Sequence, residues 1–211
     1  MIFGFGIWII LNKLDLKAID YPYLKIKFYL FLLLFIFVCV EIAIEVLYFS
    51  NIPLTNHVLC CSSIFDTSEA INSLPFGLNT TLLLFLFYLF FTLTILSNFT
   101  RNMILSFISN LIFLFVSYYA VTYFFGTYIY ELPTHKCPFC MLQKEYYYIG
   151  YILWSNLFLG VFFGISQLIL KIFTKQELII SYKATILFNT IFVILCTYFV
   201  IIYYIKNGVF L

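Results

Sequence analysis

The stretch FYLFLLLFIFVCVEIAIEVLYFS, residues 28–50, decides the class of fold. A helix needs about 20 consecutive and mainly apolar residues to cross a membrane, and this stretch meets that requirement. Across the whole chain 64% of the residues are hydrophobic and 9% are charged. Soluble domains have about 45–50% apolar and about 25% charged residues, and no soluble fold of this length can bury so much apolar surface. The chain is therefore an integral membrane protein.

Four further stretches have the length and composition of a spanning helix: residues 76–96, 103–125, 147–173 and 184–205. We expect an all-α fold, a bundle of five transmembrane helices in one domain of residues 1–211. Its expected partner is the lipid bilayer, and because no basic patch is present we expect no nucleic acid. Residues 1–27 form an N-terminal segment whose apolar opening, MIFGFGIWIIL, is half as long as a span. This opening is either an interfacial helix or a helix trimmed by a misplaced start.

The distribution of positive charge predicts the orientation, because cytoplasmic loops carry an excess of Lys and Arg. Eight of the eleven positive residues lie on one side: Lys13, Lys17, Lys25, Lys27, Arg101, Lys171, Lys175 and Lys183. The other side has Lys136, Lys144 and Lys206. We therefore expect a cytoplasmic N-terminus and two outward loops, residues 51–75 and 126–146.

The chemically reactive residues gather in these two loops. Two cysteines, Cys39 and Cys196, lie inside apolar spans, where a thiol behaves as a small hydrophobe. The outward loops contain both histidines and the other four cysteines: His57, Cys60, Cys61, His135, Cys137 and Cys140. The short turn around Arg101 joins the second and third spans into a hairpin, so the two loops start from neighbouring helix ends. We treat the six side chains as one candidate site.

The motif Cys137-Pro-Phe-Cys140 is read as the entry to the fourth span. Pro138 suits the first turn of a helix, and a cysteine at a helix N-terminus has a lowered thiol pKa because of the helix dipole. These features favour a redox-active dithiol. The same spacing suits a metal site with His135 as a third ligand. A structural disulfide that fixes the loop is the third alternative.

The first outward loop contains the adjacent pair Cys60 and Cys61. A disulfide between adjacent cysteines closes a strained ring and is easily reduced, which suits electron transfer. Together with His57, the pair also suits a soft cation such as copper, zinc or mercury. The remaining alternative is a permanent bridge from either cysteine to Cys137 or Cys140.

Several of these positions resemble the vitamin K epoxide reductase family and the functionally analogous disulfide-bond oxidase DsbB. They are Cys61, Ile64, Thr67, Ala70, Pro75 and the later Cys137-Pro-Phe-Cys140. The resemblance implies a bacterial inner-membrane thiol–disulfide oxidoreductase whose cysteine loops face the periplasm. It also implies that Cys140 faces a quinone and Cys137 relays electrons from Cys60 or Cys61, which accept them from a periplasmic thioredoxin-like partner. Adjacent loop cysteines and flanking histidines are not part of the family's pattern, and they favour the metal alternative.

Two carboxylates interrupt the first span. Glu41 and Glu45 are four residues apart and therefore share one helix face. A charged group in the hydrocarbon region costs about 2.5–3.5 kcal/mol on insertion scales, so such residues usually face a polar interior or a pathway. We predict either a proton or ion pathway, or a protonated carboxyl that is hydrogen-bonded to an asparagine of a neighbouring helix.

Overall fold

The structure, a computed structural model, describes residues 1–51, 79–175 and 179–211. Within these residues five helices are long and apolar enough to cross a membrane, as the sequence predicts. They are α2 (Leu24–Ser50), α4 (Thr80–Phe99), the run from Met103 to Tyr130, α7 (Ile149–Thr174) and α8 (Ile179–Asn207). Helices dominate because no water is available in a bilayer, so each backbone N–H and C=O must be paired within its own segment.

The described part of the chain divides into two compact units. The first consists of α1 (Ile2–Lys17), α2 and the last residues of α7. The second consists of α4, the run from Met103 to Tyr130, most of α7, and α8. The second unit carries the Cys137-Pro-Phe-Cys140 motif.

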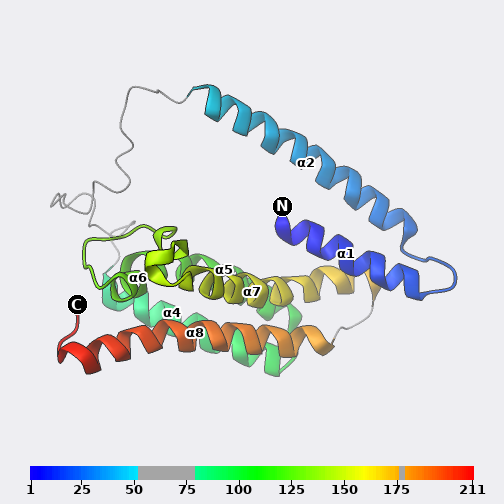
Figure 1. Ribbon diagram of the computed structural model, residues 1–211. Coiled ribbons are helices and arrows are strands. Elements are labelled where there is room, and N and C mark those ends of the chain that lie inside the picture. The colour runs from blue at the N-terminus through cyan, green and yellow to red at the C-terminus, as the bar shows by residue number, and fades with distance from the viewer. Residues whose placement is uncertain (52–78, 176–178) are drawn as a thin grey trace. The chain divides into compact units, whose positions relative to one another are not determined.

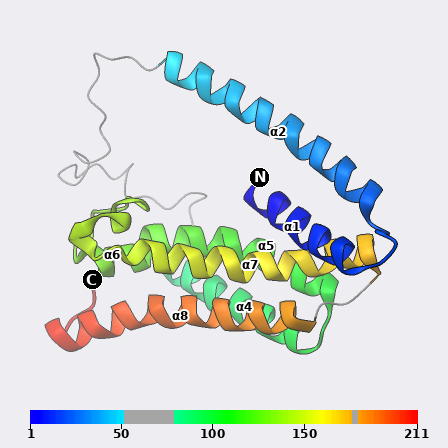
Figure 2. The same ribbon diagram turned by 45° about the vertical axis from the view of Figure 1, so that its right-hand side comes forward.

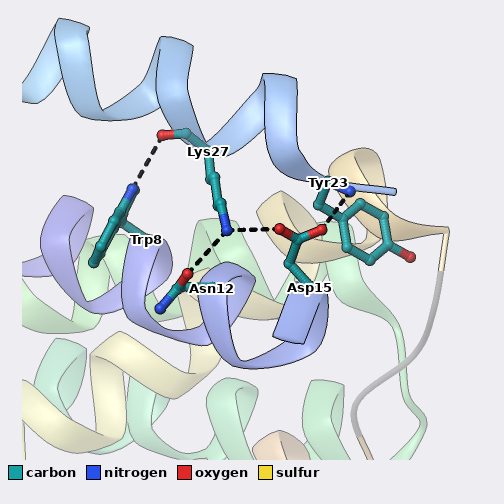
Figure 3. Close-up of polar contacts among 5 residues, drawn as sticks. All are labelled: Trp8, Asn12, Asp15, Tyr23 and Lys27. Atoms are coloured by element: carbon teal, nitrogen blue, oxygen red, sulfur yellow. Dashed lines mark hydrogen bonds and ion pairs between the residues drawn. The ribbon is translucent and has the colours of Figure 1, made fainter. Parts of the chain in front are cut away.

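In the first unit α1 is a helix of 16 residues, which at 1.5 Å per residue measures about 24 Å and is shorter than a span. Figure 3 shows how α1 is joined to α2. The Lys27 ammonium lies 2.6 Å from the buried Asp15 carboxylate and donates a hydrogen bond to Asn12. The Trp8 indole N–H donates to the Lys27 carbonyl, and the backbone N–H of Tyr23 donates to Asp15. These contacts pair the buried charges and so make their burial tolerable.

In the second unit α4, α5 (Met103–Ala120), α7 and α8 run side by side (Figures 1 and 2). The predicted hairpin of the second and third spans is confirmed, because α4 and α5 are joined by a short turn and pack along each other. Arg101 takes a left-handed conformation in that turn, with φ of 56°. The Asn102 side chain then caps α5 by accepting a hydrogen bond from the backbone N–H of Leu105.

A buried polar network connects the four helices. The Asn98 carbonyl oxygen on α4 accepts hydrogen bonds from Ser106 on α5 and Gln167 on α7. The Asn189 amide on α8 donates to Asn110 on α5 at 3.0 Å. Such side-chain hydrogen bonds are typical of contacts between membrane helices, where apolar surfaces gain little by association.

Two glycines of α7 make room for this network. A Cβ atom at Gly160 would lie 2.0 Å from the Asn189 side-chain oxygen, and one at Gly164 would lie 2.3 Å from the Asn110 amide nitrogen. Only glycine therefore allows α7 to approach α5 and α8 this closely. The bundle thereby fixes the positions of α5 and α7. The segment that contains Cys137-Pro-Phe-Cys140, called the cysteine loop below, lies between these two helices in the sequence.

Between α5 and the loop, the third span changes its helical geometry. The π-helical segment η3 (Val121–Phe125) follows α5, and the short helix α6 (Gly126–Tyr130) follows η3. The backbone N–H of Gly126 reaches the carbonyl of Val121, and a Cβ atom at Gly126 would lie 2.7 Å from that oxygen. The glycine accommodates the wider turn. Tyr130 is the last residue of α6 and lies at the start of the loop.

Candidate functional site: a histidine–cysteine cluster beside an apolar cavity

The loop between α6 and α7 carries the Cys-x-x-Cys motif, but the motif does not open the fourth span. Cys140 begins the 3₁₀ turn η4 (Cys140–Leu142), which is followed by a second 3₁₀ turn, η5 (Lys144–Tyr146). Tyr147 and Tyr148 take left-handed conformations, with φ of 51° and 56°, and α7 begins only at Ile149. The prediction that the motif lies at the N-terminus of this helix is therefore wrong. Neither cysteine belongs to the first turn of α7.

His135, Cys137 and Cys140 form a compact cluster. One nitrogen of the His135 ring and the two sulfur atoms all lie within 4.8 Å of one another. His135 is 4% exposed and Cys140 is 7% exposed, whereas Cys137 is half-buried. The cluster thus has a sheltered side at His135 and Cys140, and an accessible side at Cys137.

Burial keeps the imidazole of His135 neutral, so that a nitrogen lone pair is available to a hydrogen-bond donor or a metal ion. Its ring packs edge-to-face against Tyr130, with ring centroids 4.3 Å apart. Burial lowers the pKa of His135 below its ordinary value, because the charged form would lose its hydration. Within the described residues its buried Nε2 atom has no hydrogen-bond partner. An unsatisfied buried nitrogen costs free energy, so an incoming proton donor or cation would be bound there favourably.

Tyr130, which the sequence interpretation missed, joins α6 to the loop that carries the cluster. Its hydroxyl donates a short hydrogen bond to the Cys137 carbonyl and accepts one of 3.0 Å from the backbone N–H of Met141. One hydroxyl therefore joins the backbone on both sides of the Cys-x-x-Cys segment. The only sequence signal is a tyrosine at the end of a span, seven residues before Cys137, and the chain contains 18 tyrosines.

The loop is also anchored to α7. The Trp154 indole N–H donates a hydrogen bond of 3.2 Å to the Pro138 carbonyl. A Cβ atom at Gly150 would lie 2.6 Å from the Met141 side chain and 3.0 Å from its backbone carbonyl carbon. Glycine at this position lets the backbone beside Cys140 rest on the helix.

An apolar cavity of about 370 Å³ adjoins the motif. Its walls include Pro138 and Phe139, the two residues between the cysteines, and Leu142 from the same loop. Tyr118 of α5 and several residues of α7 complete it, namely Tyr151, Trp154, Ser155 and Phe158. Its volume lies in the range of about 300–1,000 Å³ that is usual for pockets of small organic ligands.

The structure thus brings together three of the six predicted site residues, namely His135, Cys137 and Cys140. The other three, His57, Cys60 and Cys61, lie outside the described residues. Glu41 and Glu45 are exposed on α2 in the first unit, and their pathway role stays a prediction.

Comparisons with known proteins identify no relative of this chain. No protein-family model matches the chain, and neither a curated protein nor a solved structure does.

Proposed function

We propose that the protein is a membrane thiol–disulfide oxidoreductase in which Cys137 and Cys140 pass electrons from a thiol partner to a quinone in the bilayer. The observation that carries the proposal is the apolar cavity whose wall includes the two residues between these cysteines. A planar apolar electron acceptor in that cavity would lie beside the motif. The resemblance to the vitamin K epoxide reductase family supports the same assignment.

The chemistry requires a dithiol, a base and an electron acceptor. Oxidation removes two electrons and two protons from the Cys137 and Cys140 thiols and forms one S–S bond. A quinone supplies the matching half-reaction, because it takes up two electrons and two protons. His135 is neutral at neutral pH and accepts the proton of the attacking thiol, since the thiolate is the reactive form.

The partner's dithiol then regenerates the pair. Its thiolate attacks the more accessible sulfur of Cys137, the Cys137–Cys140 bond breaks, and a second attack leaves a disulfide in the partner. Where Cys60 and Cys61 relay the electrons of a thioredoxin-like protein, one of their thiolates makes this attack on Cys137 in place of the partner's thiolate. Outward orientation in a bacterial inner membrane belongs to the same proposal.

The test uses the full chain in detergent, with dithiothreitol as electron donor and a short-chain ubiquinone analogue as acceptor. We expect quinone reduction above the uncatalysed background, and its loss by at least a hundredfold in Cys140→Ser and Cys137→Ser. Cys196→Ser is the matched control, because Cys196 is buried in α8 and should not affect the rate. Cys137→Ser and Cys140→Ser variants that keep the wild-type rate would overturn the proposal.

A second candidate function, binding of a soft metal ion such as copper, zinc or mercury, is favoured by the cluster of His135, Cys137 and Cys140 and by a His135 Nε2 atom that has no partner among the described residues. Zinc–sulfur bonds of about 2.3 Å and zinc–nitrogen bonds of about 2.0 Å place two sulfurs and one nitrogen of a tetrahedral site about 3.5–3.8 Å apart. The present separations, within 4.8 Å, need only a small contraction to match. One imidazole and two thiolates leave a fourth position for another ligand.

Cobalt(II) titration with detection of thiolate-to-metal absorption distinguishes the two functions. If the protein binds one metal tightly, loses it in His135→Ala and reduces no quinone, the metal function holds. If it acts in electron transfer, His135→Ala slows quinone reduction at pH 7. The rate then recovers at pH 9, where the thiols ionise without a base.

A further inference from the structure

A second cavity, of about 390 Å³, adjoins the cysteine loop on the side of α6, η5 and α8. Tyr130 belongs to both places, since its ring lines this cavity while its hydroxyl bonds to the Cys137 carbonyl. The residues of the lining that carry its chemistry are Tyr130, Glu131, Glu145, Tyr146, Tyr147 and Tyr203. Tyr128 also lines the cavity, which therefore combines five tyrosines with two carboxylates.

This combination is suited to a positively charged organic group. The face of an aromatic ring attracts a cation by about 0.5–1 kcal/mol when exposed and about 2 kcal/mol when desolvated. Tyr130 and Tyr146 stand edge-to-face with centroids 4.7 Å apart, so their ring faces point in different directions, as in an aromatic cage. Glu145 is exposed and forms no ion pair within the described part of the chain. Its carboxylate adds a full negative charge.

The rim of the cavity already binds an ammonium group of the protein itself. The Lys206 Nζ atom lies 2.9 Å from a carboxylate oxygen of Glu131. Both side chains are more than half exposed, at 61% and 53%, so this ion pair is weak and can be replaced by a competing cation. Glu131 can therefore bind an ammonium group. While Lys206 is paired with it, the negative charge of Glu131 is partly neutralised and attracts a ligand less.

We propose that this cavity binds a cationic group of the thiol partner, such as a lysine or arginine side chain near its reactive cysteine, and so selects basic substrates. The inference rests on the proposed redox function and names the substrate class for it. A partner held here by its charge would lie next to Cys137, the more accessible sulfur of the pair. Selection would act on the rate of thiol–disulfide exchange, because it raises the local concentration of the reacting sulfur.

The experiment compares three small disulfides of different charge, and every rate is expressed relative to the rate of the same probe with dithiothreitol, because the thiols that leave differ in pKa. They are cystamine with two ammonium groups, neutral 2-hydroxyethyl disulfide, and 3,3′-dithiodipropionate with two carboxylates. Each is mixed with reduced full-length protein in which the four other cysteines are serine. A thiolate of the protein displaces one probe thiol, the second thiolate displaces the other, and the Cys137–Cys140 bond forms as the probe gains two electrons. The rate of this oxidation is measured for each probe.

We expect cystamine to react on the order of tenfold faster than the neutral disulfide, and the anionic probe to react most slowly. Glu145→Gln should reduce the cationic preference to about threefold or less. Lys206→Gln should increase it, because Glu131 is then released to the ligand. Asp20→Asn is the matched control: it removes the same charge from the exposed turn between α1 and α2 and should leave the preference unchanged.

The outcomes separate the inference from the function on which it rests. Equal rates for the three probes, or a preference that Asp20→Asn reduces as much as Glu145→Gln does, would show general electrostatics and refute the cationic site. If no probe oxidises the pair, the redox function itself fails, and the substrate assignment fails with it.

Discussion

Removal of a single hydroxyl in Tyr130→Phe should loosen the cysteine loop while leaving the aromatic packing in place. The Met141 backbone N–H is fully buried and would lose its acceptor, which costs about 1–3 kcal/mol for an unsatisfied buried group. The Cys137 carbonyl would lose its donor, a net loss of about 0.5–1.5 kcal/mol. Together the two losses amount to roughly 1.5–4.5 kcal/mol.

Thermal unfolding in detergent, followed by tryptophan fluorescence, measures this loss. The chain has only two tryptophans, and Trp154 is hydrogen-bonded to Pro138 in the loop. A Trp8→Phe background therefore makes the signal report on the loop and α7. At roughly 2–4 °C per kcal/mol for a chain of this size, the midpoint should fall by roughly 3–18 °C.

Tyr88→Phe is the matched control for this prediction. It also removes one tyrosine hydroxyl, but that hydroxyl bonds to Thr197 at an exposed position on α4. We expect its midpoint to fall by only a few degrees, because a side-chain hydrogen bond between membrane helices contributes only about 0.6 kcal/mol on average. The loosened loop should also let the thiols of Tyr130→Phe react with maleimide faster than those of the wild type. If they do not, or if Tyr130→Phe and Tyr88→Phe lose the same stability, the Tyr130 hydroxyl does not hold the loop in place.

Three further predictions concern the loop, its histidine and the helix contacts. Gly150→Ala should displace Met141 and change the maleimide reactivity of the pair beside it, because the new methyl group would lie 2.6 Å from the Met141 side chain. The lowered pKa of His135 means that the unfolded state binds its proton first. Stability should therefore be constant above pH 6.5 and decline as the pH falls below it, and this slope should be absent in His135→Gln when midpoints are recorded from pH 8 to 5. Gly160→Ala should cost about 1–3 kcal/mol in thermal unfolding, because its methyl group would overlap Asn189.

The spans could be predicted because backbone pairing and bilayer thickness leave few other structures for such apolar segments. The predicted ends of the spans differ from the observed helix ends where polar residues belong to the helix. The last span was expected from residue 184, but α8 begins at Ile179 and includes Ser181 and Lys183. The first was expected from residue 28, but α2 begins at Leu24, since Lys27 is paired with Asp15 and belongs inside the helix.

The candidate site was predictable to the extent that its residues are neighbours in sequence. His135, Cys137 and Cys140 lie within six positions, so a single tight loop suffices to bring them together. Tyr130 and Trp154 come from two different helices and act through hydrogen bonds to backbone carbonyls, for which the sequence carries no pattern. The left-handed Tyr147, which separates the motif from α7, is equally invisible, because non-glycine residues rarely take this conformation.

The π-helical turn at Val121–Phe125 has a consequence for how this protein tolerates change. Its five residues turn the chain by about the same angle as four α-helical residues, because a π-helix has more residues per turn. The extra residue is thus taken up locally, and α6 keeps the direction that an uninterrupted helix would give it. Deleting one residue there would restore an α-helical turn and leave Tyr130 facing the loop, whereas deleting one residue of α5 would turn Tyr130 by about 100° around the helix axis, away from the loop. The π-helical turn can therefore lose a residue at a point where the neighbouring helix cannot.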